Sequence, residues 1–365
     1  MKKVYLLLTA ICLAALTGCV KEEPYTLDEA TIEVNLDTRS GTESEQQGDR
    51  IEDVMIWVFR GGDENNWNTL AGWRTYTPPT DAYTYTSLTL HIPVALCNGD
   101  SETYRLVAVL NKGHWGTNLN LSSETTYAQL TSMKFAHSDL IEGAITEGTP
   151  GTPHTMPVSH WRDVTVTKTN THANNKCAVA NLNVFRSIAK TQLFVTKASN
   201  DFDLVIKSAT LKSSNAPTEG MVLSSLGADD LKTIDIAPEW FITDGLTQFN
   251  TSFSQSLKNT DGNPAAVTVA SNAETFKDVF VGSAFLYENK GGSSAWNEPS
   301  TNGGYCLAVE YSVDGGKTTK TENVWLPPVA RNHDYQIHAT IYGTAEIKFE
   351  VAVAPWGTIP NNLEI

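Results

Sequence analysis

Cys19, Arg39 and Arg50 are the residues near the N-terminus whose types and positions suggest chemical processing of the chain. A cysteine thiol directly after a short apolar run can carry a lipid. The two arginines enclose residues 40–49, a segment that has no large apolar side chain and is rich in Ser, Gly, Glu and Gln. Such a segment should be exposed and open to proteolysis. The arginines could equally be solvated charges at strand ends, which is the usual place for arginine.

The residues before Cys19 indicate that the chain is exported. Two lysines precede an apolar run, residues 4–16, which is too short to span a bilayer and has the flanks of a secretory signal. Leu16-Thr17-Gly18-Cys19 resembles a bacterial lipobox, in which a cysteine receives a diacylglycerol. We therefore expect residues 1–18 to be a signal peptide and the lipid on Cys19 to attach the precursor to the outer membrane. In the alternative, Cys19 only ends an ordinary signal peptide.

Charge and cysteine usage exclude other classes. The 365 residues carry a formal net charge of -15 at pH 7 without any cluster of Lys and Arg, which argues against a nucleic-acid partner. Apart from the signal segment and Cys19, the cysteines are Cys97, Cys177 and Cys306. An odd number is no disulfide framework, and we expect these residues to be small buried side chains.

The enzyme-like motifs have simpler structural interpretations. Gly315-Gly316-Lys317-Thr318 resembles the end of a phosphate loop, but Tyr311 occupies the position of the required glycine, and with Asp314 the segment predicts a hairpin turn. The histidines form no metal-binding pair, and Asp201 and Asp203 are typical of a solvated strand end. We predict no enzymatic activity, no catalytic or metal-binding residues and no cofactor.

Four tryptophans lie in predicted loops: Trp67, Trp73, Trp115 and Trp161. Exposed aromatic rings could bind glycans, whereas rings under long loops pack against the core. We expect packing. Glycan binding through Trp67 or Trp115 is kept as the alternative.

The chain is patterned for β-strands almost throughout, and helical periodicity is faint, with at most a turn or two predicted at residues 125–133 and 229–233. Strands are predicted at residues 51–59, 83–92, 104–110, 164–167, 189–196, 204–211, 279–287, 305–311, 335–342 and 347–353. Gly, Pro, Thr, His and Asn replace apolar residues between 147 and 175, so we place a domain boundary at residue 175. The sequence predicts an all-β protein of two sandwich domains.

The first predicted strand buries one face only. Its apolar residues, Ala30, Ile32, Val34 and Leu36, alternate with polar ones. At about 1.5 to 3 kcal/mol for each large aliphatic side chain, the three largest would contribute roughly 5 to 9 kcal/mol when buried. Loss of this strand would leave an open apolar groove.

The last predicted strand has the same alternation, with Ile347, Phe349, Val351 and Val353 on one face. Together with residues 335–342 it predicts a closing hairpin around Gly343-Thr344.

Short motifs along nearly the whole chain resemble those of the FimA/Mfa-type fimbrillins, the lipoprotein-derived subunits of type V pili in Bacteroidetes. The motifs are Tyr104-Arg105-Leu106-Val107-Ala108-Val109-Leu110-Asn111, Met156-Pro157-Val158-Ser159, Phe185-Arg186-Ser187-Ile188-Ala189-Lys190, Phe285-Leu286-Tyr287-Glu288-Asn289, Arg331-Asn332-His333-Asp334-Tyr335 and Val351-Ala352-Val353-Ala354-Pro355-Trp356. Each is short, and their order and spacing carry the resemblance.

The resemblance implies two transthyretin-like Greek-key β-sandwiches, here residues 40–175 and 176–365, after a signal peptide (1–18) and a lipidated pro-segment (19–39). It also implies that an arginine-specific protease cuts after Arg39 and releases the lipid on Cys19 together with the first strand. Arg50 is the second choice because it abuts the next strand. The vacated groove then accepts a strand from a neighbouring subunit, with Ile347, Phe349, Val351 and Val353 as the donor.

The resemblance thus implies a pilus subunit of the shaft or tip that serves adhesion, whose partners are other pilus subunits in a homopolymer or mixed filament. The alternative is a surface lipoprotein that keeps its lipid, either as a pilus anchor or as a module that binds glycan or a host ligand.

Overall fold

The computed structural model describes residues 29–38, 51–61, 67–78, 87–95, 101–116, 119–136, 156–167, 176–225, 227, 231, 246–271, 273, 276–300 and 302–355. The signal segment, Cys19, Arg39, Arg50 and Cys97 lie outside these residues, as does Trp356 with the rest of the C-terminus. The described chain is nearly all β, and its helices are η1 (Lys112–His114) and α2 (Tyr127–Ser132).

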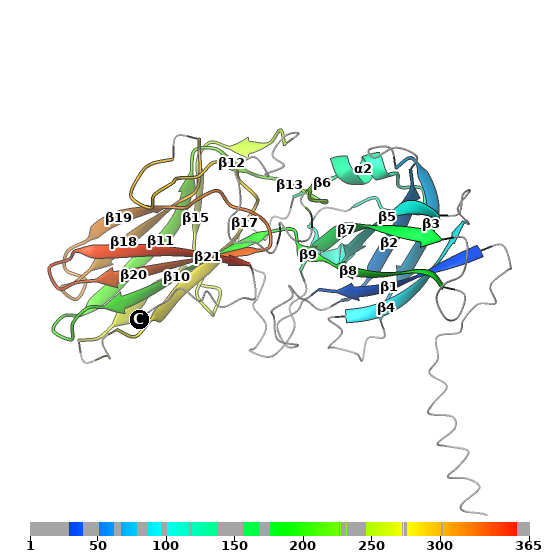
Figure 1. Ribbon diagram of the computed structural model, residues 1–365. Coiled ribbons are helices and arrows are strands. Elements are labelled where there is room, and N and C mark those ends of the chain that lie inside the picture. The colour runs from blue at the N-terminus through cyan, green and yellow to red at the C-terminus, as the bar shows by residue number, and fades with distance from the viewer. Residues whose placement is uncertain are drawn as a thin grey trace, which may run out of the picture.

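The N-terminal sandwich packs a three-stranded sheet against a five-stranded one (Figure 1). The first sheet has the order β4 (Ser87–Ala95), β1 (Glu29–Asp37), β8 (Lys176–Asn183). The second has the order β3 (Thr69–Tyr76), β2 (Val54–Arg60), β5 (Ser101–Leu110), β7 (Val158–Thr167), β9 (Phe185–Arg186). Their facing side chains form one hydrophobic core.

The C-terminal sandwich encloses a second core between two further sheets. One sheet has the order β17 (Val279–Leu286), β10 (Ala189–Lys197), β20 (His333–Ile341), β21 (Ile347–Pro355). The other has the order β15 (Phe253–Ser256), β11 (Leu204–Ser213), β18 (Cys306–Ser312), β19 (Lys320–Trp325), and β16 (Val267–Val269) also pairs with β11. Two small pairs complete the description: β12 (Ala216–Pro217) with β14 (Phe249–Asn250), and β13 (Gly220–Met221) with β6 (Lys134–Phe135).

The two sandwiches share one arrangement of strands. In the first, β1 pairs antiparallel with β4 and parallel with β8. In the second, β10 pairs antiparallel with β17 and parallel with β20. The second sandwich then adds β21 at the far edge of β20, and no described strand takes that place beside β8.

The predicted all-β class is confirmed, and the boundary between the sandwiches differs from the one expected. Because β8 and β9 pair with β1 and β7, the chain enters the second sandwich between Arg186 and Ala189 rather than at residue 175. The polar, Gly/Pro-containing stretch of residues 147–175 includes β7, and the strand that follows it, β8, belongs to the same sandwich. Composition marks a loop, but it does not say which strands lie on its two sides.

Residues 219–224 of the C-terminal sandwich form a strap across the domain junction. Within this strap, β13 pairs with β6 of the N-terminal half, and Val222 packs in the first hydrophobic core. Lys134 Nζ lies 2.9 Å from Glu219 Oε1, and Trp161 Nε1 donates to Ser224 O at 2.8 Å. The strap therefore ties the two sandwiches together by backbone pairing, an ion pair and burial.

Arg331 holds the other side of this strap. Its guanidinium is buried and donates to Met221 O at 2.9 Å, to Val222 O at 3.3 Å and to Glu288 Oε2 at 2.6 Å. A buried ion pair of this kind is costly to break from one side only, because the remaining charge loses its partner.

We predict that Arg331→Met lowers the free energy of unfolding by about 3 to 5 kcal/mol, since it leaves the buried Glu288 carboxylate without its cationic partner and removes the guanidinium donors to Met221 O and Val222 O. Urea denaturation measures the loss, and hydrogen exchange should show it first in residues 219–224. Lys317→Met, in an exposed turn, is the matched control and should change stability by less than about 0.5 kcal/mol. Equal effects of the two substitutions would contradict the role given to Arg331.

Candidate functional site

The site with the clearest functional meaning is the place that β1 occupies in the first sandwich. β1 lies in the middle of its sheet, paired with β4 from Glu29↔Ala95 to Asp37↔Ser87 and with β8 from Thr31↔Lys176 to Asp37↔Asn183. Both backbone edges of the strand are therefore hydrogen-bonded. Its removal would break two ladders and leave the facing edges of β4 and β8 unpaired.

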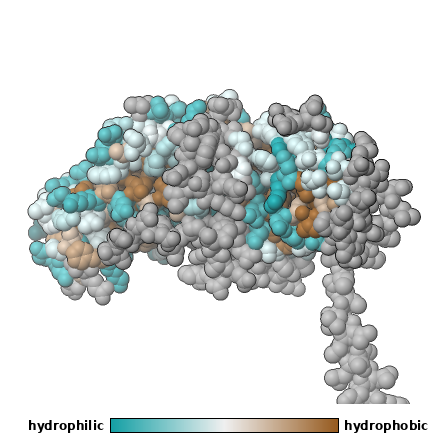
Figure 2. Space-filling model, in the orientation of Figure 1, coloured by the Kyte–Doolittle hydropathy of each residue, from teal (hydrophilic) through white to brown (hydrophobic). Residues whose placement is uncertain are grey.

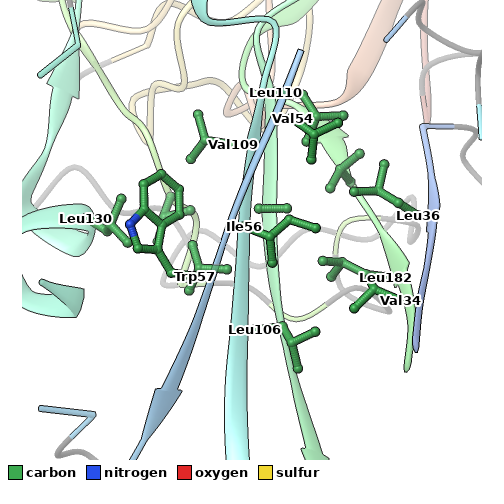
Figure 3. Close-up of a cluster of buried hydrophobic side chains, with 14 of the residues drawn as sticks. Val34, Leu36, Val54, Ile56, Trp57, Leu106, Val109, Leu110, Leu130 and Leu182 are labelled. Atoms are coloured by element: carbon green, nitrogen blue, oxygen red, sulfur yellow. The ribbon is translucent and has the colours of Figure 1, made fainter. Parts of the chain in front are cut away.

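The inward face of β1 is fully buried, as the alternation predicted. Ile32 and Val34 are 0% exposed and Leu36 is 1% exposed. Figure 3 shows Val34 and Leu36 on the same side as Leu182 of β8, pointing toward Ile56 of the opposite sheet. Ala30 pairs with Val94 in the β4 ladder. The site of β1 is thus a slot lined by aliphatic side chains.

The outward face of β1 carries a row of polar side chains that crosses all three strands. Asn35 Nδ2 donates to Asn181 Oδ1 of β8 at 3.0 Å, and Thr89 Oγ1 of β4 donates to Asn35 Oδ1 at 2.8 Å. One register step away, Glu33 Oε2 lies 3.7 Å from His91 Nε2 of β4. These contacts join residues that are far apart in the sequence, and the hydrophobic pattern alone did not reveal them.

Near the start of β1 the pairing with β8 is irregular, because the register shifts between Thr31 and Ile32. Cys177 Sγ donates to Thr31 O at 3.1 Å there, and the cysteine is 5% exposed. In the other sandwich Cys306 is also buried, and burial raises the pKa of its thiol to about 11. Both cysteines are buried, as expected of small hydrophobic side chains.

The walls of the slot have attachments of their own to the opposite sheet. β4 lies under β3, where Arg74 donates to His91 O and Gly72 approaches the β4 backbone. A Cβ at Gly72 would lie 2.5 Å from Pro93 O. On the other side β8 lies next to β7, and Arg162 donates to Asn181 O. The two walls are therefore held in place by contacts that do not pass through β1.

The chain that re-enters the fold after residues 39–50 is fixed by Asn111. This buried residue has a left-handed backbone with φ 58°, its Oδ1 accepts from Glu52 N at 2.9 Å and its Nδ2 donates to Met156 O at 2.8 Å. Asp53 accepts from Lys112 N, and burial raises the pKa of the Asp53 carboxyl although that hydrogen bond opposes the shift. The start of β2 is thus anchored independently of the segment before it.

The C-terminal hairpin forms as predicted, with β21 antiparallel to β20 from His333↔Pro355 to Ile341↔Ile347. Its left-handed turn residue is Ala345 (φ 65°) rather than a glycine, and Tyr311 Oη donates to Ala345 O at 2.7 Å. Three residues of the predicted donor face are half-buried against the core: Ile347, Val351 and Val353.

β21 is an edge strand, held by one ladder only. Its most buried donor residue is Phe349, whose ring lies 5.4 Å from that of Trp296. Figure 2 shows hydrophobic atoms at the surface in the region of β21, which agrees with this partial burial.

Trp67 and Trp115, the two tryptophans considered for glycan binding, are buried. Trp115 is 0% exposed and its Nε1 donates to Leu110 O at 2.8 Å, and Trp67 is 6% exposed. Trp73 and Trp161 lie in β3 and β7, not in loops, which corrects that prediction. The rings of Trp67 and Trp115 are therefore packed in the protein, as expected, rather than presented at its surface.

Two of these rings pack on one cation that the sequence did not single out. The Arg105 guanidinium lies 4.5 Å from the ring centroid of Trp67 and 4.1 Å from that of Trp161. Asp163 accepts from it at 2.7 and 2.8 Å, so the cation has an anionic partner within the same cluster.

The described residues contain no group of three or more His, Cys, Asp and Glu that could hold a metal ion. Residues 313–319 form the predicted turn between β18 and β19, and Asp314 accepts from Ser312 Oγ and from Thr318 N. These hydrogen bonds hold the pKa of Asp314 well below its usual range. Within the described part of the chain, no helix is long and apolar enough to cross a membrane.

Comparison with solved structures finds the same fold in a bacterial protein described as a candidate cell adhesion protein. A candidate cell adhesion protein from Parabacteroides distasonis ATCC 8503 superposes with a TM-score of 0.52 at 11% identity, over 91% of this chain and 98% of that protein. A candidate cell adhesion protein from Bacteroides eggerthii DSM 20697 gives a TM-score of 0.47 at 13% identity, over 90% and 96% of the two chains. The fimbrial anchor protein Mfa2 from Porphyromonas gingivalis gives 0.38 at 9% identity, over 90% and 98%.

At these identities the likeness to the Parabacteroides protein shows a common fold across both sandwiches. No protein-family model matches the sequence. No curated protein matches it either.

We predict that Ile32→Ala lowers the free energy of unfolding of the N-terminal sandwich by about 2 to 5 kcal/mol, because it leaves a cavity in the slot. Val179→Ala on the outer face of β8 is the control, since Val179 is 40% exposed and its truncation should cost less than about 0.5 kcal/mol. Urea denaturation of both variants gives the comparison. Similar losses would mean that β1 is not packed as described.

We also predict that Gly72→Ala destabilises the same sandwich by about 1 to 3 kcal/mol, because the added Cβ would collide with Pro93 O and with Val94 Cγ1, 2.8 Å away. The matched control is Gly113→Ala, where an added Cβ meets nothing within 4 Å. Urea denaturation reports the stability and hydrogen exchange reports the protection of β4. A neutral Gly72→Ala would show that β3 does not hold the β4 wall.

Proposed function

We propose that this chain is a structural subunit of a bacterial cell-surface pilus, in the shaft or at the tip, that serves adhesion. Its first strand is removed by proteolysis and replaced by a strand from a neighbouring subunit. The observation that carries this proposal is the position of β1, an N-terminal strand that fills the middle of a sheet and is followed directly by residues 39–50.

The energetics favour replacement over simple loss. Burial of Ile32, Val34 and Leu36 contributes roughly 5 to 9 kcal/mol, to which the two ladders add. An empty slot would expose aliphatic side chains and two unpaired strand edges, and such a surface readily binds an extended peptide. Because β3 and β7 hold the two walls, the slot can keep its shape while one strand leaves and another enters.

The position of Arg39 suits the cut. Asp37 ends β1, and a cut after Arg39 would leave the whole strand on the side of the lipidated Cys19. Arg50 is less suitable because Ile51 is 2% exposed and Glu52 N is bound to Asn111, which restricts the backbone that a protease must hold. We propose an arginine-specific protease as the activating partner and the outer membrane as the site of the lipidated precursor.

β21 is the proposed donor. It is an edge strand with one ladder, so it can leave without opening the middle of a sheet. Donor and acceptor lie in different sandwiches of the same chain, so strand exchange between subunits is head to tail and produces an open filament. The fold found in the Parabacteroides candidate cell adhesion protein and the fimbrillin-like motifs support this function over an enzymatic one.

We predict that an arginine-specific protease cuts the folded precursor after Arg39 and leaves Ser40 as the new N-terminus, because residues 40–49 carry no large apolar side chain and such a segment is expected to be accessible to a protease. N-terminal sequencing of cell-surface material identifies the cut. In cells the cut protein should give a ladder of multimers that resists denaturation.

Arg39→Ala should abolish the cut and the ladder, whereas the matched Arg50→Ala should leave both intact. A folded precursor that resists the protease, or a ladder that persists in Arg39→Ala, would refute this assignment.

A further inference from the structure

The side chains around β1 also indicate which strand the slot prefers, an inference that rests on the proposed strand replacement. We propose that the slot selects an incoming strand by two outward side chains, an acid that faces His91 and an amide between Thr89 and Asn181. We infer that β21 of a second copy meets this requirement only in part. In a mixed filament, β21 then serves as the donor to another kind of subunit, and this slot receives a strand that carries both groups from a subunit different from this chain.

The amide requirement comes from the polar row. Asn35 is both donor and acceptor in it, because it gives a hydrogen bond to Asn181 and receives one from Thr89. A side-chain amide can play both roles at once, whereas an alanine can play neither. Cross-strand pairs of this kind distinguish one partner strand from another.

The acid requirement comes from the neighbouring register position. Glu33 is paired with His91 of β4 in the ladder, and its carboxylate lies 3.7 Å from the imidazole. A lysine at this position would place two basic groups opposite each other, which disfavours pairing.

The inward face adds a limit on size. The positions of Ile32, Val34 and Leu36 are completely enclosed, and the residues around them are mainly aliphatic. A larger side chain in such a site forces its neighbours to move.

β21 fits these requirements best when Glu350 takes the position of Glu33. This register puts Val351 at the position of Val34 and Val353 at that of Leu36. It also puts Phe349 into the enclosed site of Ile32 and Ala352 at the position of Asn35. Phe349 is larger than the Ile32 side chain that it replaces. Ala352 lacks the amide group of Asn35.

When β21 runs in the same direction as β1, the other possible pairing registers fit the slot less well than this one. A strand can slip only by two residues if the same face is to stay inward. One such slip places Lys348 opposite His91. The other brings Pro355 to the position of Leu36, in the middle of a sheet, where proline cannot donate its ladder hydrogen bond.

Peptide binding to the emptied slot tests the inference. The full chain would carry a specific protease site within residues 40–49, be cut, and be separated from β1 in mild denaturant. Fluorescent peptides of residues 29–38 and 347–355 are then titrated into it. We expect the β1 peptide to bind, its Asn35→Ala version to bind about 3- to 10-fold more weakly, and the β21 peptide to bind more weakly than the β1 peptide.

Two controls tie the effect to the named side chains. An Ala352→Asn version of the β21 peptide should regain affinity. In a slot with Thr89→Val and Asn181→Ala, the difference between the β1 peptide and its Asn35→Ala version should disappear, as in a double-mutant cycle.

Equal binding of the Asn35→Ala and unmodified β1 peptides, or a β21 peptide that binds as tightly as β1, would overturn the selection of a different subunit while leaving strand replacement intact. A slot that does not take back even the β1 peptide would overturn both proposals. The two failures are therefore distinguishable.

Discussion

The first sandwich depends on one constraint: a strand in the middle of a sheet needs hydrogen-bond partners on both edges and a packed face. β1 is hydrogen-bonded to β4 along one edge and to β8 along the other. These two strands in turn depend on β1 to pair their facing edges. Yet the strand lies at the N-terminal end of the described chain and is connected to the rest by residues 39–50 alone. A strand that lies in the middle of a sheet but is joined to the domain by one connection can be exchanged for another. The incoming strand must pair with the same two neighbours and fill the same part of the core.

The rest of the fold limits the damage that such an exchange can do. β3 and β7 hold the walls from the opposite sheet, and Asn111 anchors the chain where it re-enters the fold at Glu52. At the other end, Arg331 and the strap of residues 219–224 join the two sandwiches through buried contacts. These backbone pairs and buried hydrogen bonds do not involve β1. We therefore expect the opposite sheet and the second sandwich to keep their positions when β1 is exchanged.

The sequence predicted the parts of this structure that depend on local periodicity. The alternation of Ile32, Val34 and Leu36 and that of the last hairpin were both observed, since a half-buried strand shows its pattern within a few residues. β3, β8 and β19 were not predicted: β3 and β19 bury few side chains, β3 contains Gly72, and the inward residues of β8 include Ala178 and Ala180, whose small side chains give a weak hydrophobic pattern. Pairing partners were also out of reach. Asn35 and Asn181 meet although 146 positions separate them, and nothing local to either residue encodes that contact.

The two sandwiches together show why the first strand, and not its counterpart, is the replaceable one. β10 occupies the position in the second sandwich that β1 occupies in the first, between one antiparallel and one parallel neighbour. It is joined to β9 before it and to β11 after it by described chain, so a single cut would leave it attached. The strand of the second sandwich that can detach most easily is β21, which lies at the edge of its sheet and pairs with β20 alone. One chain thus has a middle strand that a single cut can free and an edge strand that can leave with least disruption. This asymmetry gives an assembly of such chains its direction.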